Sequence, residues 1–108
     1  MSIDLPQPLK NYFSAVNSKD IDAMLAPFAT EAIVKDEGAT MNGRAAIRTW
    51  IEETTRKYGV SLSPEAIDRD GGRVSVRALM SGDFPGSPAR VTYRFILRDG
   101  EIGELEIG

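Results

Sequence analysis

Residues 12–38 read "YFSAVNSKDIDAMLAPFATEAIVKDEG", and this stretch decides the predicted fold. It starts inside a helical pattern, because apolar residues recur at the i, i+3, i+4, i+7 spacing of one helix face. These residues are Leu9, Tyr12, Phe13 and Val16. A second short helix shows the same spacing, with Asn17 or Ser18 as its expected N-cap and Pro27 limiting its length. Its apolar residues are Ile21, Met24, Leu25 and Phe28.

The end of the stretch predicts a strand over residues 32–36. Side chains alternate between the two faces of a strand, so Asp36 shares a face with Ala32 and Val34. Those two apolar residues favour burial, and Asp36 therefore points toward the interior. One interpretation is a functional carboxylate in a pocket, where burial would raise its pKa and make it a usable base. The other is an aspartate that caps the turn into Gly38, or a different register.

The rest of the chain predicts one more helix and four strands. The helix begins after Asn42 or Gly43 and ends at Gly59, and its inner stripe is Ile47, Trp50, Ile51 and Tyr58. The first of these four strands contains Pro64, which indicates an edge strand or a bulge. "RDGGR" at residues 69–73 is typical of a hairpin. Helices at one end of the sequence and antiparallel strands at the other predict an α+β fold in one domain, residues 1–108.

The last hairpin carries a register prediction. A two-residue loop at Asp99-Gly100 would place Phe95 opposite Glu104. One extra residue, or a bulge at Gly103, places Phe95 opposite Leu105 and Arg94 opposite Glu106. We prefer the second register because it matches apolar faces and pairs opposite charges.

Composition excludes several classes of function. The 108 residues carry a net charge of −3, which disfavours nucleic-acid binding because phosphates need a basic face. No window is long and apolar enough for a membrane span, and "MSIDLPQPLK" does not predict a signal peptide. The chain has no cysteine and no histidine. We therefore expect a cytoplasmic protein with no metal and no organic cofactor, in which a carboxylate performs any proton transfer.

With these elements in order, the chain resembles nuclear transport factor 2-like domains of the SnoaL-like and ketosteroid-isomerase-like branch. The resemblance rests on residues 12–38, on "MNGRAAIRTW" at 41–50 and on "YRFILRDGEIGELEI" at 93–107. It implies a cone-shaped, curved antiparallel sheet wrapped around three helices from the N-terminal half, with a deep apolar pocket between them. The branch includes isomerases, polyketide cyclases and dehydratases, and also members that only bind or dimerise.

The resemblance also implies site residues. In ketosteroid isomerases a tyrosine on the first helix donates to the substrate oxyanion, and that position falls on Tyr12. The general base at the end of the first strand falls on Asp36. A second, protonated aspartate falls on Tyr93, which departs from the isomerase pattern although a tyrosine can also donate to an oxyanion. The predicted pocket walls are Trp50, Phe13, Met80 and Phe95. Ordinary core packing explains Trp50 equally well, and it is also the alternative for the ring of Tyr12.

Two functional hypotheses follow. In the first, the domain binds a small apolar carbonyl compound, Asp36 moves a proton next to the carbonyl, and tyrosine hydroxyls stabilise the enolate-like oxygen. In the second, the domain binds a ligand or dimerises without catalysis. The resemblance implies a homodimer through the outer face of the sheet.

Overall fold

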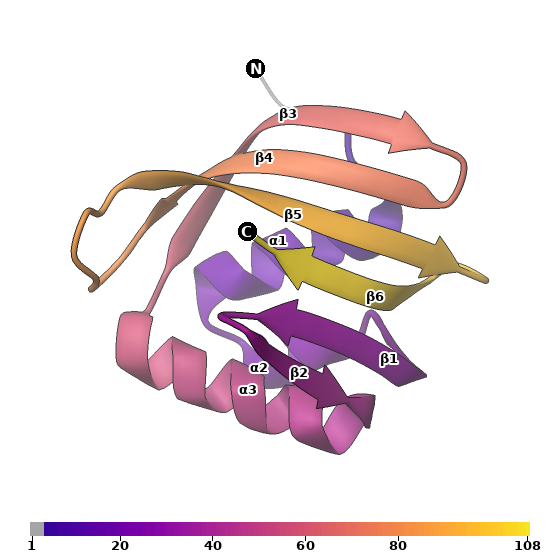
Figure 1. Cartoon of the computed structure of the whole chain (residues 1–108), viewed down its shortest axis with the longest axis horizontal. Coiled ribbons are helices and arrows are strands. Elements are labelled where there is room, and N and C mark those ends of the chain that lie inside the picture. Colours follow the sequence, from indigo (N-terminus) through magenta and orange to yellow (C-terminus); the bar gives the residue numbers. More distant parts are fainter. Residues whose placement is uncertain (1–3) are drawn as a thin grey trace.

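The computed structural model describes residues 4–108 of the chain (Figure 1). Three helices and six strands follow one another along the sequence. In order they are α1 (Gln7–Ser18), α2 (Ile21–Leu25), β1 (Phe28–Asp36), β2 (Ala39–Asn42), α3 (Gly43–Tyr58), β3 (Ser61–Asp70), β4 (Arg73–Ser81), β5 (Ala89–Arg98) and β6 (Glu101–Ile107).

All six strands form one sheet in the order β2-β1-β6-β5-β4-β3. Figure 1 shows the sheet curving over α1, with α3 running beside the β1–β2 end. The predicted α+β class and curved sheet are confirmed. The sheet differs from the expected antiparallel one at a single pairing, because β1 and β6 run parallel. The first and last strands of the chain are thus neighbours in the sheet.

The predicted apolar face of α1 is buried, and in α2 Met24 and Leu25 are buried while Ile21 is partly buried. Phe28, which was predicted to belong to the second helix, is instead the first residue of β1. Leu9, Tyr12, Phe13 and Val16 are each at most 5% exposed. The N-cap of α2 is Asp20, whose carboxylate accepts a hydrogen bond from the Ala23 amide at 3.1 Å. The expectation of Asn17 or Ser18 as the cap was wrong, because α1 continues through Ser18 and the chain turns at Lys19. Lys19 has a left-handed backbone, with φ of 60° and ψ of 32°.

The strand β2 was not predicted from the sequence. The N-cap of α3 is Asn42, one of the two predicted positions, and both Met41 and Asn42 pair with β1. Glu37 and Gly38 form the tight turn between the two strands, and both have positive φ. At the other end of α3, Gly59 is the predicted left-handed stop.

The predicted register of the last hairpin is confirmed. Phe95 lies opposite Leu105, and Arg94 lies opposite Glu106. The ladder shifts by one residue because Ile96 pairs with Glu104 while Leu97 pairs with Ile102, which leaves Gly103 as the bulge. Without this bulge the apolar residues of β6 would face the wrong side of the sheet.

The strand β3 is an edge strand with a bulge, as Pro64 predicted. The side-chain amide of Asn17 binds its backbone at Leu62 in both directions. It donates to the Leu62 carbonyl at 2.9 Å and accepts from the Leu62 amide at 2.7 Å. This pair of bonds ties the C-terminal turn of α1 to the edge of the sheet.

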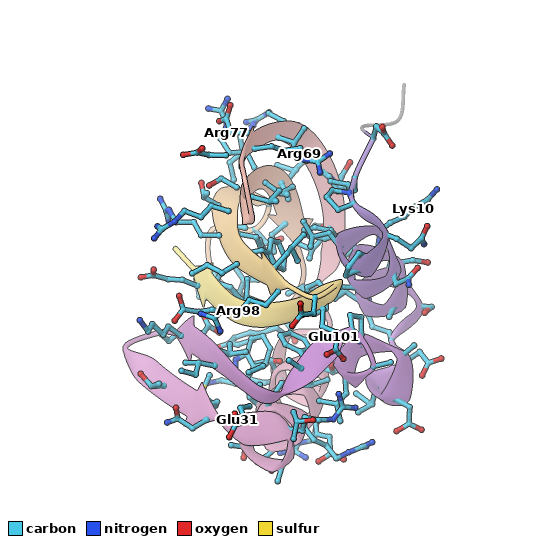
Figure 2. All side chains as sticks on the ribbon, turned by 90° about the vertical axis from the view of Figure 1, so that its right-hand side faces the viewer. Lys10, Glu31, Arg69, Arg77, Arg98 and Glu101 are labelled. Atoms are coloured by element: carbon cyan, nitrogen blue, oxygen red, sulfur yellow. The ribbon has the colours of Figure 1, made fainter. Side chains whose placement is uncertain are left out.

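The core between sheet and helices contains a cluster of aromatic rings. Tyr12 contacts Phe28 and Phe95 at centroid distances of 5.7 and 6.1 Å, and Phe13 contacts Tyr93 at 5.4 Å. These are edge-on contacts, which aromatic rings prefer to face-to-face stacking. Charged side chains such as those labelled Lys10, Glu31 and Arg77 point outward (Figure 2). Two members of this cluster, Tyr12 and Tyr93, also line a cavity between the helices and the sheet.

Candidate functional site

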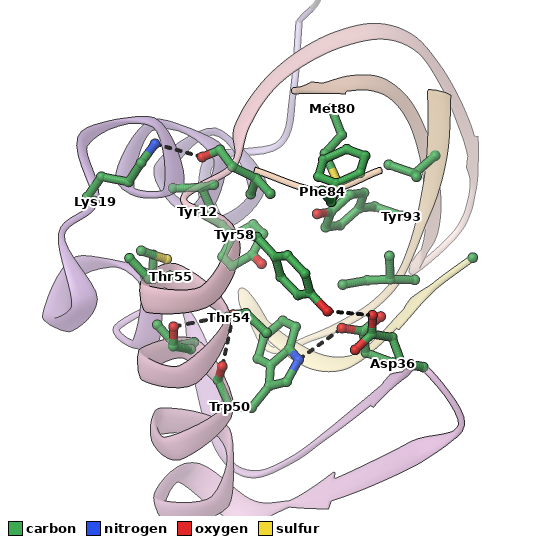
Figure 3. A pocket seen from close by; sticks show the side chains of 18 of the residues that line it. Tyr12, Lys19, Asp36, Trp50, Thr54, Thr55, Tyr58, Met80, Phe84 and Tyr93 are labelled. Atoms are coloured by element: carbon green, nitrogen blue, oxygen red, sulfur yellow. Dashed lines mark hydrogen bonds between the residues drawn. The ribbon is translucent and has the colours of Figure 1, made fainter. Parts of the chain in front are cut away.

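A cavity of about 540 Å³ opens between α1, α3 and the concave face of the sheet (Figure 3). Its volume lies in the range of small-molecule sites, about 300–1,000 Å³. Most of its wall is apolar, from residues including Val16, Met24, Ile51, Val60, Met80, Phe84, Val91 and Ile107. Strand alternation supplies the sheet side of this wall, because Met80 and Val91 belong to the inward-facing sets of β4 and β5.

Asp36 brings a carboxylate into this apolar space from the last residue of β1. Ala32 and Val34, on the same face, are fully buried, so the predicted direction of Asp36 is confirmed. Burial raises the pKa of the Asp36 carboxyl above its ordinary value. A hydrogen bond from Trp50 lowers this pKa, the neighbouring Glu37 charge raises it, and the Glu37 backbone amide lowers it. The net direction is upward, which suits a group that exchanges a proton nearer neutral pH.

Two tyrosines face the same cavity. Tyr12 and Tyr93 are each 3% exposed, and their ring centroids lie 6.4 Å apart. Burial raises the pKa of both phenols, and the Asp36 charge raises them further. Both hydroxyls are therefore protonated at neutral pH and can donate. Among residues 4–108, neither hydroxyl binds another side chain or the backbone. No side-chain polar atom in this range is fully buried without a partner, so both hydroxyl oxygens keep some access to the cavity. The two donors are thus open to a molecule in the cavity.

The helix α3 holds both acidic residues at the β1–β2 turn. The indole Nε1 of Trp50 donates to Oδ2 of Asp36 at 3.0 Å, and the hydroxyl of Tyr58 donates to Oε1 of Glu37 at 3.2 Å (Figure 3). Trp50 and Tyr58 are eight residues apart and share one face of the helix. Oδ2 of Asp36 is thus engaged by Trp50, and no side chain among residues 4–108 donates to Oδ1.

The structure brings five of the seven predicted site residues together around one cavity. They are Asp36, Tyr12, Tyr93, Trp50 and Met80. Phe13 and Phe95 do not line it. Both are buried, and they pack on Tyr12 and Tyr93 from the side of the core. Their placement gives them a supporting position behind the two tyrosines.

Sequence reasoning missed several residues of the cavity. Lys19, Glu37, Thr54, Tyr58 and Phe84 all line it. Tyr58 was assigned to the inner stripe of its helix, which was the available signal for a position facing the interior. Phe84 lies in the β4–β5 connection and packs edge-on against Tyr58 at 6.4 Å, a contact that no local pattern indicates.

Residues 4–108 contain no group of three or more acidic side chains close enough together to hold a metal ion. None of the helices in this range combines the length and the apolar content that crossing a bilayer requires.

Comparison with known proteins gives a consistent assignment. A family model described as a SnoaL-like domain matches residues 9–105. A candidate polyketide cyclase from Sinorhizobium meliloti is 41% identical, with a TM-score of 0.95, and the match covers 100% of this chain and 99% of that one. A protein with a ketosteroid isomerase-like fold from Catenulispora acidiphila, crystallised with trimethylamine, is 23% identical. Its TM-score is 0.85, and the match covers 97% of this chain and 86% of that one.

A candidate polyketide cyclase from Xanthomonas campestris has a TM-score of 0.80 at 24% identity, covering 94% of this chain and 86% of the other. No curated protein matches the chain. The two matches under 25% identity support the fold, while the family model and the Sinorhizobium relative support the family. The fold is of a small-molecule-binding type, and the cavity lies between its sheet and helices. The chain belongs to the SnoaL-like domain family.

Proposed function

We propose that this domain binds a small, mostly apolar ketone and that Asp36 moves a proton at the carbon next to the carbonyl. The observation that carries the proposal is the half-buried Asp36 carboxylate, which faces an apolar cavity together with two unpaired tyrosine hydroxyls. A base, an oxyanion site and a water-poor space are the components that this step requires.

The step is a transfer of one proton. Oδ1 of Asp36 takes the proton from the α-carbon, and the electrons of the C–H bond form a carbon–carbon double bond. The carbonyl becomes an enolate, whose oxygen accepts hydrogen bonds from Tyr12 and Tyr93. Protonated Asp36 then returns the proton. Isomerisation returns it to another carbon, whereas cyclisation or dehydration uses the same enolate for a carbon–carbon bond or for loss of a leaving group.

An experiment that needs no knowledge of the natural substrate tests this proposal. Apolar cyclic ketones that raise the melting temperature are incubated in D₂O, and loss of the α-proton signal is followed by NMR. We expect wild-type protein to accelerate the exchange, and Asp36→Asn to lose at least about a hundredfold of that acceleration. Exchange that persists unchanged in Asp36→Asn would rule out Asp36 as the base.

A second candidate function is ligand binding without turnover. The Trp50–Asp36 hydrogen bond favours it, because it stabilises the carboxylate and lowers its basicity. In this case ketones bind equally to wild type and to Asp36→Asn, and neither protein accelerates exchange.

We also infer a homodimer through the outer face of the sheet, where Arg77, Thr92, Arg94, Ile96 and Glu106 alternate with core residues. A self-complementary patch of mixed charge suits a two-fold interface. Size-exclusion chromatography with light scattering tests it, and a monomer at high micromolar concentration would overturn it.

A further inference from the structure

We propose that Lys19 forms an anion-binding subsite at the mouth of the cavity, so that the ligand is an apolar ketone with a carboxylate remote from its carbonyl. This inference rests on the proposed function for the carbonyl end of the ligand. The subsite itself is argued from the position and partners of Lys19.

The ammonium group of Lys19 has no counter-charge within the described part of the chain. The ion pairs among residues 4–108 are Lys35–Glu104, Arg48–Asp22 and Arg90–Glu65. Lys19 instead donates to the Val60 carbonyl at 2.7 Å and to Ser61 Oγ at 3.4 Å. An ammonium has three N–H donors, so these two neutral acceptors hold the group in place and leave one donor free. A held cation with a spare donor is suited to binding a carboxylate.

The cavity carries opposite charges on its two sides. Lys19 is the one cationic side chain among its described lining residues, and Asp36 and Glu37 are its acidic ones. Figure 3 shows Lys19 and Asp36 on opposite sides of the pocket. An anionic group is repelled near Asp36 and attracted near Lys19, so a ligand with one negative end has one favoured orientation. In that orientation its uncharged end lies at Asp36 and the tyrosines.

The backbone conformation of Lys19 also supports a binding role for its side chain. Lys19 closes α1 in the left-handed conformation, which usually selects glycine or asparagine at a helix end. A lysine at this position directs its side chain toward Val60 and the cavity mouth, as the dashed bond in Figure 3 shows. The net charge of −3 makes a local cation more important, since the rest of the protein repels anions.

The test compares two ligands that differ in one charge. They are a β-tetralone with a carboxylate on its aromatic ring and the methyl ester of the same compound. Their dissociation constants are measured by calorimetry at low ionic strength. Because Lys19 is exposed, we expect wild-type protein to bind the carboxylate about three- to fivefold more tightly than the ester. The preference should disappear in about 0.5 M salt.

Three variants separate a binding role from a structural one. Lys19→Met removes the charge and keeps the length, and Lys19→Gly suits the left-handed backbone and so preserves the turn. Both should bind acid and ester equally, with ester affinity unchanged. Lys10→Met is the matched control, because Lys10 is exposed on the outer side of the same helix, and it should retain the preference (Figure 2).

Several outcomes would overturn the subsite. They are equal affinity for acid and ester in wild-type protein, an unchanged preference in both Lys19 variants, a loss shared by Lys10→Met, or no binding of either compound at millimolar concentration. Proton exchange is scored separately on the ester. A preference for the carboxylate without any exchange in wild-type protein would refute the proposed catalysis and leave the subsite standing.

Discussion

Replacing Trp50 with phenylalanine should raise the pKa of Asp36 by about one unit. The indole N–H is the side-chain donor to this carboxylate, at 3.0 Å, and it stabilises the ionised form. A hydrogen bond to a charged group contributes about 1.5–3 kcal/mol, and one pKa unit corresponds to about 1.4 kcal/mol. Asp36 is partly exposed, so water replaces part of the lost bond, and the lower end of this range applies.

The measurement is a ¹³C NMR titration of the aspartate side-chain carboxyl carbons. The signal of Asp36 is assigned by its absence from Asp36→Asn. The matched control is Tyr58→Phe, which removes the neighbouring bond from α3 to Glu37 and leaves the Trp50–Asp36 bond in place. This variant should shift the Asp36 titration much less than Trp50→Phe does.

If Asp36 is the base, the rise in its pKa should also change the pH dependence of α-proton exchange. The pH profile of α-proton exchange depends on ionised Asp36, so its rising limb should move to higher pH by the shift that NMR measures. An Asp36 pKa that stays within about 0.3 units in Trp50→Phe, or that falls, would contradict a stabilising role of the indole N–H. It would mean that solvent replaces the indole completely.

Three further predictions concern stability and are measured by urea unfolding. Because burial raises the folded-state pKa of Asp36 above its ordinary 3.8, its ionisation destabilises the fold as pH rises from 3.8 through the folded pKa. Asp36→Asn should thus be more stable than wild type at neutral pH, and the gap should close below pH 3.8; a gap independent of pH would contradict this. Phe28→Ala should cost about 3–5 kcal/mol, since Phe28 is fully buried, and a cost under about 1 kcal/mol would show that the core collapses around the gap. Gly82→Ala should cost about 1–3 kcal/mol, because a Cβ there would lie 2.8 Å from the Tyr58 carbonyl oxygen; an unchanged midpoint would show that the loop yields freely.

The parts of the fold that local patterns determine were predictable. The α1 stripe follows from its 3.6-residue spacing, and the Gly103 bulge follows from the need to match Phe95 with Leu105. The parallel pairing of β1 with β6 was not predictable, because a strand's alternation identifies its faces and not its neighbour. The strand β2 was missed because it has only four residues, "ATMN", and only Thr40 among them is β-branched.

In the candidate site, too, local patterns predicted some residues and not others. Strand parity was enough to direct Asp36 inward, and helix spacing placed Tyr12 and Trp50 on inner faces. Lys19 was not predictable, since its position depends on a left-handed turn and on the distant Val60 carbonyl. Phe13 and Phe95 were predicted as pocket walls, but they lie behind Tyr12 and Tyr93 and do not line the cavity. Spacing identified them as inward-facing, but it does not distinguish a cavity wall from the packed layer behind it.

The bond pair between Asn17 and Leu62 has a consequence for solubility. An edge strand presents unpaired amides and carbonyls to which another chain can add, and this is a common route to aggregation. At Leu62 both backbone groups are already occupied by one side-chain amide, which fills the place of an incoming strand. Nearby, Pro64 lacks an N–H and the bulge disturbs the regular spacing. The opposite edge, β2, is only four residues long. Both margins of the sheet thus carry features that oppose edge-to-edge pairing with another chain.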